Sequence, residues 1–264
     1  MPRRKTEYRD KLLAEPELTV APGRPLTLPP GMPATIEVGM GAGRILVARA
    51  AAEPGRFFVG VELKEERTWQ AVRECRKLGL RNVGFIPLPI DQADEFLPTG
   101  RFDELVILFP DPWPRGRDER RRLVAPGNLR LFARWLAPGA RCVFQTDSPA
   151  LFAYGRDMIA AAGFPIHVAE SDVPPGAIST KFEAIWRAKR LSIHQVVFER
   201  PARLPDDPLF DPAPSTSRPS VRFARRLAAA NGGAADPRPS PAPEAAPEAA
   251  TVDADVAGRA SSES

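Results

Sequence analysis

An apolar strand, a glycine-rich loop and a helix follow one another without interruption in ATIEVGMGAGRILVARAAAEP, and this succession constrains the fold most. Gly39, Gly41 and Gly43 permit a tight turn between the strand and the helix, and the acidic Glu37 stands just before them. Such a loop lets the backbone approach a nucleotide-like ligand, although a purely structural turn can carry the same glycines. The segment therefore predicts the first strand–helix unit of an open sheet.

The alternation of strands and helices continues along the chain. Apolar runs and helical spacing predict further strands in Phe57–Leu63, Asn82–Pro89, Glu104–Pro110, ARCVFQTD and His194–Arg200, and helices in KEERTWQAVRECRKLGL, DQADEFLP, PGNLRLFARWLAPG and ALFAYGRDMIAAAGF. FPIHVAE and His194–Arg200 are expected to pair as closing strands. This order predicts an α/β fold with a mostly parallel central sheet and helices on both faces.

Ligands of open parallel sheets bind beyond the carboxyl ends of the strands. The loops after Val38, Leu63, Pro89, Phe109 and Thr146 should therefore converge at one edge. Glu62, at the end of the second strand, is suited to accept hydrogen bonds from the two ribose hydroxyls of an adenosine. A solvated glutamate at a strand end is the alternative.

The segment from Phe109 to Pro114, FPDPWP, follows the fourth expected strand. Its three prolines restrict the backbone around one carboxylate, Asp111, and one indole, Trp113. Rigid backbone of this kind positions side chains, so Asp111 is a candidate for a role in catalysis. A stiff surface turn with an incidental aspartate is the less favoured alternative.

A basic run follows directly, with only Asp118 and Glu119 to offset its charge; its arginines are Arg115, Arg117, Arg120, Arg121 and Arg122. Runs of charge are usually solvated, but the position beside the expected site favours phosphate binding.

Three further places in the sequence carry candidate groups. Thr180, Lys181, Phe182 and Glu183 together offer groups that could grip a base and its sugar-phosphate, although Thr180 and Glu183 also form a helix capping box. Asp147 ends the fifth expected strand and could contact a base or cap a loop. His194 is interpreted as a packed strand histidine without a catalytic role.

Length and composition limit the domain organisation, the kind of partner and the cellular compartment. The 264 residues allow one sizeable domain, expected at 34–200, between a basic arm at 1–33 and a tail at 201–264 whose Pro, Ala and Ser content predicts disorder. The pI of about 9.4 is compatible with a polyanionic partner. Cys75 and Cys142 are interpreted as buried thiols in a reducing compartment, and the chain lacks a membrane span or apolar leader, which favours the cytoplasm.

Taken in order, EVGMGAG, Glu62, FPDPWPRGRDERRRLV, QTD at 145–147 and TKFE closely resemble the bacterial tRNA (guanine-N7-)-methyltransferase family over roughly residues 34 to 200. The proline–tryptophan motif with its basic run is specific to that family, whereas the glycine loop alone indicates only the wider superfamily. The resemblance implies a Rossmann-like class I methyltransferase fold, S-adenosylmethionine as donor, and a guanine in the tRNA variable loop as target.

The resemblance also implies roles for individual residues. It marks Asp111 as catalytic and close to the cofactor, and Arg115, Arg121, Asp147 and the stretch Thr180–Glu183 as tRNA-contacting. Its implied cofactor-binding residues are Glu37, Gly39, Gly41, Gly43, Glu62, Pro89, Ile90 and Asp111.

Three departures from the family pattern stand out. Pro89 and Ile90 occupy the positions where the family usually has an Asp-Ala pair for the adenine amino group, with Asp91 displaced, although the Ile90 backbone N–H could still serve the adenine ring. Asp118 replaces a family histidine, and the tail beyond Arg200 has no family counterpart.

The expected enzyme needs tRNA and S-adenosylmethionine but no metal or membrane, and a monomer or a homodimer is compatible with the sequence. Guanine N7 carries a lone pair and no proton, so Asp111 is expected to orient the base rather than to remove a proton. The alternatives are a methyltransferase of another RNA or a small molecule, a non-catalytic RNA-binding protein with a decayed cofactor site, and, more distantly, a nicotinamide-dependent oxidoreductase.

Overall fold

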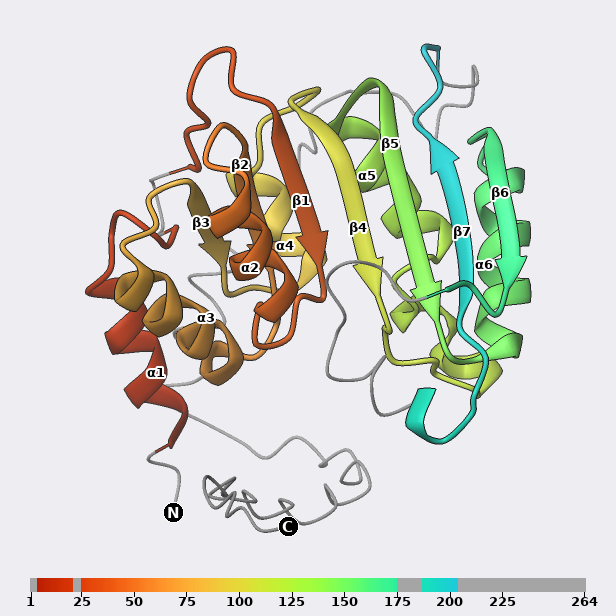
Figure 1. Cartoon of the computed structure of the whole chain (residues 1–264), viewed down its shortest axis with the longest axis horizontal. Coiled ribbons are helices and arrows are strands. Elements are labelled where there is room, and N and C mark those ends of the chain that lie inside the picture. Colours follow the sequence, from red (N-terminus) through yellow and green to blue (C-terminus); the bar gives the residue numbers. More distant parts are fainter. Residues whose placement is uncertain (1–3, 21–24, 175–186, 204–264) are drawn as a thin grey trace, which may run out of the picture. The chain divides into compact units, whose positions relative to one another are not determined.

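One seven-stranded sheet organises the protein (Figure 1). The computed structural model describes residues 4–20, 25–174 and 187–203, all within one compact unit, Met1–Val221. The strand order is β3-β2-β1-β4-β5-β7-β6, with bounds β1 Ala34–Val38, β2 Phe57–Val61, β3 Val83–Ile86, β4 Phe102–Leu108, β5 Leu136–Thr146, β6 Ile166–Ser171 and β7 His194–Glu199. Strands β1 to β5 pair in parallel, and β7 pairs antiparallel with both β5 and β6. The mostly parallel sheet and its closing pair are thus confirmed.

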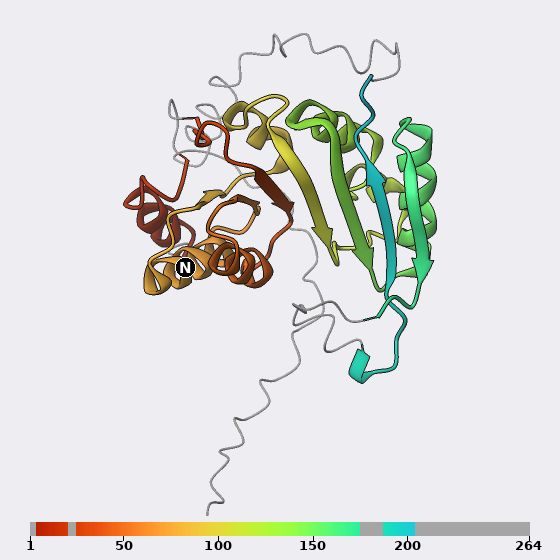
Figure 2. The ribbon, with the colours of Figure 1, turned by 45° about the horizontal axis from the view of Figure 1, so that its top comes forward.

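Helices cover both faces of the sheet (Figures 1 and 2). Their bounds are α1 Arg4–Leu13, α2 Arg44–Ala52, α3 Glu65–Leu78, α4 Ile90–Ala93, α5 Pro126–Trp135 and α6 Pro149–Ala161, with 3-10 turns η1 Asp94–Phe96 and η2 Gly116–Arg121. Helices α2 and α3 lie over β1 to β3 on one face, and α5 and α6 lie on the opposite face. None of the helices in the described ranges is long and apolar enough to span a membrane.

Two hydrophobic clusters follow from this layering. Side chains of α2 and α3, such as Leu46 and Val72, pack with Phe58 and Phe85 of the sheet in one cluster. The larger cluster joins alternate residues of the strands to α5 and α6 and includes the fully buried Phe144. Because side chains alternate across a strand, β2 and β3 contribute to both clusters, whereas β1, β4, β5 and β7 contribute only to the larger one.

The end of α5 departs from the sequence-based expectation. The helix expected between Pro126 and Gly139 ends at Trp135, and β5 begins at the next residue, Leu136. Pro138 disfavours helical backbone in the residue before it, and Gly139 has a φ of 78°. These two residues lie within an irregularity of the β4–β5 pairing, where the register shifts between Phe102 and Glu104.

The N-terminal residues that the structure describes pack beside α3 and β3. Leu12 and Leu18 are buried in the same cluster as α3, and Thr19 forms a bridge with Phe85 of β3. Arg9 on α1 also pairs with Glu65 on α3 at 2.8 Å.

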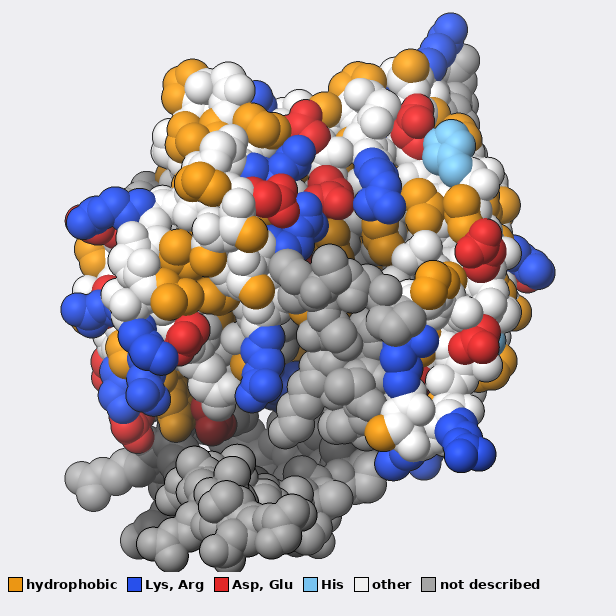
Figure 3. Space-filling view, in the orientation of Figure 1, with side chains coloured by type: hydrophobic (Ala, Val, Ile, Leu, Met, Phe, Trp, Pro, Cys, Tyr) orange, Lys and Arg blue, Asp and Glu red, His pale blue; other side chains and the backbone are white. Residues whose placement is uncertain are grey.

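Opposite charges pair near the amino ends of the central strands. Glu104 on β4 forms ion pairs with Arg49 on α2 at 2.8 Å and with Arg141 on β5 at 3.3 Å. Figure 3 shows acidic and basic side chains side by side over this part of the sheet. Glu104 is thus paired twice within the protein at this end of the sheet, whereas the expected site residues lie at the opposite end.

Candidate active site

The glycine loop between β1 and α2 adopts backbone that other residues rarely tolerate. Gly39, Gly41 and Gly43 have φ values of 74°, 58° and 67°. A methyl group added to Gly39 would lie 2.9 Å from Leu123 Cδ1, and one added to Gly43 would lie 2.8 Å from Ala71 Cβ. At Gly41 it would meet open space, so the backbone there is accessible to a ligand. The loop therefore combines close internal packing with one open position.

Glu62 is fixed directly beneath this loop. Its side chain is buried, and its two carboxylate oxygens accept hydrogen bonds from the backbone N–H groups of Gly41 at 3.0 Å and Lys64 at 2.8 Å. A carboxylate has about four acceptor positions, so two further donors can still be received. The alternative of a solvated glutamate at a strand end is wrong, because Glu62 is buried and links the ends of β1 and β2.

Glu37, at the end of β1, is buried on the face that α2 covers. Burial raises the pKa of this carboxyl to about 8, while the nearby Arg49 guanidinium and a backbone hydrogen bond from Leu46 act in the lowering direction. The proton therefore stays on Glu37 at neutral pH. Glu37 lies two residues before Gly39, the first glycine of the loop.

The loop after β3 brings Pro89 and Ile90 to the same edge. Pro89 precedes α4, and its carbonyl accepts the N–H groups of Gln92 and Ala93 at 2.9 Å each. The Ile90 side chain packs against the larger hydrophobic cluster, and Asp91 is exposed. The Ile90 N–H lies in the first helical turn, where backbone donors have no intrahelical partner, so it can donate to a ligand.

The FPDPWP segment is held in a strained conformation. Phe109 and Trp113 have φ values of 48° and 43°, although each precedes a proline, a position that favours extended backbone. Each such residue costs on the order of 1–3 kcal/mol, and strain of this kind persists only where its surroundings impose it. The prolines predicted rigidity but not this shape, which brackets the exposed Asp111 between two left-handed residues.

Surrounding contacts hold this loop in place. Phe109 N–H donates to the Gln145 carbonyl of β5 at 2.9 Å. Arg122 donates from Nε and Nη2 to the Trp113 carbonyl at 3.2 and 3.1 Å. A two-pronged bond from a charged donor contributes on the order of 1.5–3 kcal/mol, enough to offset one strained residue.

The basic run divides into two groups. Arg121 lies over the Trp113 ring at 4.8 Å and pairs with Asp118 at 3.6 Å, and Arg122 is bound to Trp113. Arg115, Arg117 and Arg120 are exposed, and each lacks an ion-pair partner within the described part of the chain. We call these three the free arginines. The resemblance singled out Arg115 and Arg121 among the five arginines, and the structure shows that these two differ, since Arg121 is paired and Arg115 is not.

Asp147 follows β5 at the same edge. The helix cap that could have explained it belongs to its neighbour, since Ser148 Oγ accepts the Leu151 N–H of α6 at 3.2 Å. Asp147 itself makes no hydrogen bond or ion pair with other described residues. Its carboxylate is therefore available to a ligand.

The remaining sequence-based expectations concern the stretch Thr180–Glu183 and His194. Thr180, Lys181, Phe182 and Glu183 lie outside the described residues. His194 is buried in β7, where its Nδ1 lies 2.9 Å from Ser171 Oγ and its ring stacks on Phe152, which agrees with a packed strand histidine.

Two residues beside the candidate site were missed at the sequence level. Leu123 contacts the glycine loop, and Tyr154 of α6 contacts the end of the basic run. Both stand in ordinary apolar patterns, and Tyr154 reaches Glu119 across 35 positions of sequence. Only the fold brings such residues together.

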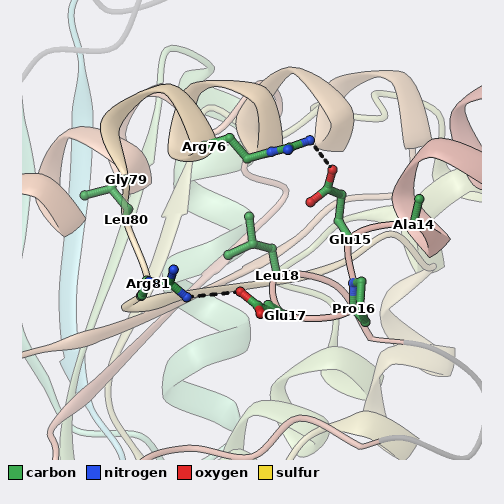
Figure 4. Close-up of a pocket in the computed structure, with 9 residues that line it drawn as sticks. All are labelled: Ala14, Glu15, Pro16, Glu17, Leu18, Arg76, Gly79, Leu80 and Arg81. Atoms are coloured by element: carbon green, nitrogen blue, oxygen red, sulfur yellow. Dashed lines mark hydrogen bonds and ion pairs between the residues drawn. The ribbon is translucent and has the colours of Figure 1, made fainter.

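A groove of about 620 Å³ lies elsewhere, where the N-terminal residues meet the end of α3 (Figure 4). Its charged side chains are paired, Arg76 with Glu15 at 2.6 Å and Arg81 with Glu17 at 3.1 Å. The groove contains none of the candidate residues, because α3 ends there and begins beside Glu62 at the opposite edge.

Known proteins resemble this chain in sequence and in fold. The model of the Methyltransf_4 family of methyltransferases matches residues 32–196. A tRNA (guanine-N(7)-)-methyltransferase of Chloroflexus aurantiacus is 32% identical over 160 residues, which are 60% of this chain and 70% of that protein. The enzyme of the same description from Porphyromonas gingivalis is 29% identical over 166 residues, covering 60% of this chain and 67% of its own length.

Solved structures show the same fold. An antibiotic-related methyltransferase superposes with a TM-score of 0.50 at 21% identity, covering 63% of this chain and 87% of its own. The 16S rRNA methyltransferase KamB gives a TM-score of 0.50 at 19% identity, with the same coverage. The Rossmann-like methyltransferase architecture is thereby confirmed.

Proposed function

Because the chain belongs to the tRNA (guanine-N(7)-)-methyltransferase family, we propose that it transfers a methyl group from S-adenosylmethionine to N7 of a guanine in the variable loop of tRNA. One observation carries this proposal beyond family membership. The strained loop that presents Asp111 stands at the same sheet edge as the glycine loop, and Leu123, just after the basic run, contacts Gly39. A carboxylate, a nucleoside-binding loop and free arginines thus lie together.

The residues present fit S-adenosylmethionine. The open backbone at Gly41 and the anchored Glu62 carboxylate suit the ribose, and the N–H of Ile90 can donate to a ring nitrogen of adenine. Glu37 and the other two glycines shape the floor of the pocket. When bound, S-adenosylmethionine supplies a methyl group on a positively charged sulfur.

The chemistry requires positioning rather than proton removal. Guanine N7 has an in-plane lone pair and no proton, so no base is needed to create the nucleophile. Asp111 accepts hydrogen bonds from the N–H groups of the guanine Watson–Crick edge and stabilises the positive charge that develops on the purine. Its exposure between two prolines suits a group that meets a macromolecular substrate.

The tRNA must present its guanine outside a regular helix. N7 lies in the major groove, which is deep and narrow in A-form RNA, so the base has to be exposed or turned out of its stack. We assign phosphate contacts to Arg115 and its free neighbours Arg117 and Arg120, and base or backbone contacts to Asp147, Arg121 and Thr180–Glu183. An enzyme with this substrate acts in the cytoplasm.

The test is incubation of the purified protein with labelled S-adenosylmethionine and unmodified tRNA, followed by nucleoside analysis. We expect 7-methylguanosine from normal tRNA and no transfer to a tRNA that carries 7-deazaguanosine in the variable loop. Label on another nucleoside would favour a methyltransferase of different specificity. Calorimetry that finds no S-adenosylmethionine binding would support the alternative of a decayed cofactor site.

A further inference from the structure

One arginine of the basic run differs from its neighbours in its contacts. Arg122 is half-buried, and its guanidinium lies between the Trp113 carbonyl, to which it donates twice, and the ring of Tyr154, 4.2 Å from its centroid. Its own carbonyl accepts the Asn128 side-chain amide of α5 at 3.0 Å. Arg122 therefore connects the Asp111 loop to both α5 and α6.

Tyr154 is held in turn at its far end. Its hydroxyl donates to Glu119 Oε1 at 2.9 Å, so Glu119 within η2 and Arg122 directly after it are both tied to α6 through one side chain. Burial and the Glu119 carboxylate raise the pKa of Tyr154 to about 12, which keeps the hydroxyl protonated and able to donate. The ring offers Arg122 an aromatic face, which favours a planar guanidinium over an ammonium.

We propose that Arg122 and Tyr154 are positioning residues that hold Trp113 in its left-handed conformation and thereby fix Asp111 over the cofactor pocket, without contacting tRNA themselves. Trp113 would otherwise relax toward the extended backbone that Pro114 favours, and Asp111 lies only two residues before it. The inference rests on the proposed function, since it assigns these residues to the same reaction.

The test compares Arg122→Lys, Tyr154→Leu and their double variant, with Arg73→Lys on the exposed face of α3 as the matched control. Lysine keeps the charge but cannot donate twice in one plane. We expect kcat to fall at least about tenfold in each variant, because small misplacements of a reacting group have large effects on rate. The Kd for tRNA should stay within about twofold, since no phosphate contact is removed.

Two further measurements test whether Tyr154 acts through Arg122 and whether both residues hold Trp113. If Tyr154 acts through Arg122, the double variant should be about as slow as the Arg122 variant alone. The fluorescence contributed by Trp113, measured as the difference from the same protein with Trp113→Phe, should change in both single variants and not in Arg73→Lys. Tyr154→Phe keeps the ring and should retain most of the activity. It serves as the conservative variant in case Tyr154→Leu fails to fold.

A wild-type kcat in Arg122→Lys and Tyr154→Leu would overturn the proposal. So would a tenfold weaker tRNA Kd at unchanged kcat, because Arg122 would then be a phosphate contact. If the wild-type protein transfers no methyl group to tRNA, the proposed function fails instead. The Trp113 fluorescence still tests in that event whether Arg122 and Tyr154 hold Trp113 in place, and an unchanged signal would overturn the proposal.

Discussion

Glu37 illustrates how much a single position depends on its surroundings. In the sequence it is the acidic residue before a glycine loop, and its expected role came from a family resemblance. In the structure it is buried, with a pKa raised to about 8 mainly by loss of hydration. The sequence indicated where this carboxyl lies along the chain but could not show that the folded protein keeps it protonated.

This raised pKa makes stability depend on pH. The folded state holds a proton on Glu37 up to about pH 8, whereas the unfolded chain releases it near the ordinary glutamate pKa of 4.5. Folding stability therefore falls as pH rises between these values and is constant with respect to this group outside them. Glu37→Gln removes this titration. The free energy of unfolding of the variant, relative to that of wild type, should therefore increase by up to about 1.4 kcal/mol per pH unit across that window.

Urea unfolding at pH 5, 6.5 and 8 measures this difference, with Glu66→Gln on the exposed side of α3 as control. The control should follow wild type at every pH. Parallel profiles for Glu37→Gln and wild type would show that Glu37 is ionised in the folded protein.

Among the elements, the loop and turn after β4 changed most between sequence and structure. Proline spacing predicted a rigid segment, and that is consistent with the two left-handed residues that flank Asp111. The division of the basic run was not predictable, because it depends on Tyr154 and Trp113, which approach the arginines only in the folded protein.

The free arginines should determine how tRNA binding depends on salt. Each phosphate contact contributes about 0.7–0.9 to the slope of log K against log salt concentration. Arg115/Arg117/Arg120→Ala should therefore reduce that slope by about two to three. Titration of tRNA binding between low and moderate salt measures the change.

A matched control is Arg73/Arg76/Lys77→Ala, which removes the same charge from the half of α3 remote from Glu62. Its slope should equal that of wild type. If both triple variants reduced the slope equally, net charge rather than a defined contact surface would explain the binding.

At the scale of the whole molecule, the alternation of strands and helices was readable from apolar runs, glycine stops and prolines. Their spatial order was not, because β7 enters between β5 and β6 through pairs such as Gln145 and Gln195, which are 50 positions apart. The start of β5 at Leu136 was also missed, since a helix signal and a strand signal overlap there. Long-range pairing decides such cases, and local pattern does not.

The reactivity of the two cysteines reports on the packing of the helices on each face of the sheet. Cys75 lies in the α2–α3 cluster and Cys142 in the larger one, and both are buried and free. Burial is the main cause that raises the pKa of Cys75 to about 12 and that of Cys142 as well. Neither thiol should react with Ellman's reagent at pH 8 in the native protein, and both should react in guanidinium. Rapid reaction of either native thiol would mean that its layer opens readily.

In the proposed reaction, Asp111 presents guanine to the methyl donor. Single-turnover methyl transfer by Asp111→Asn at saturating S-adenosylmethionine and tRNA tests this role. We predict a rate at least about 100-fold below wild type, because an amide keeps the shape but loses the charge that stabilises the cationic purine. The Kd values for both ligands should stay within about threefold, since Asp111 acts mainly in the transition state. A wild-type rate would contradict the account.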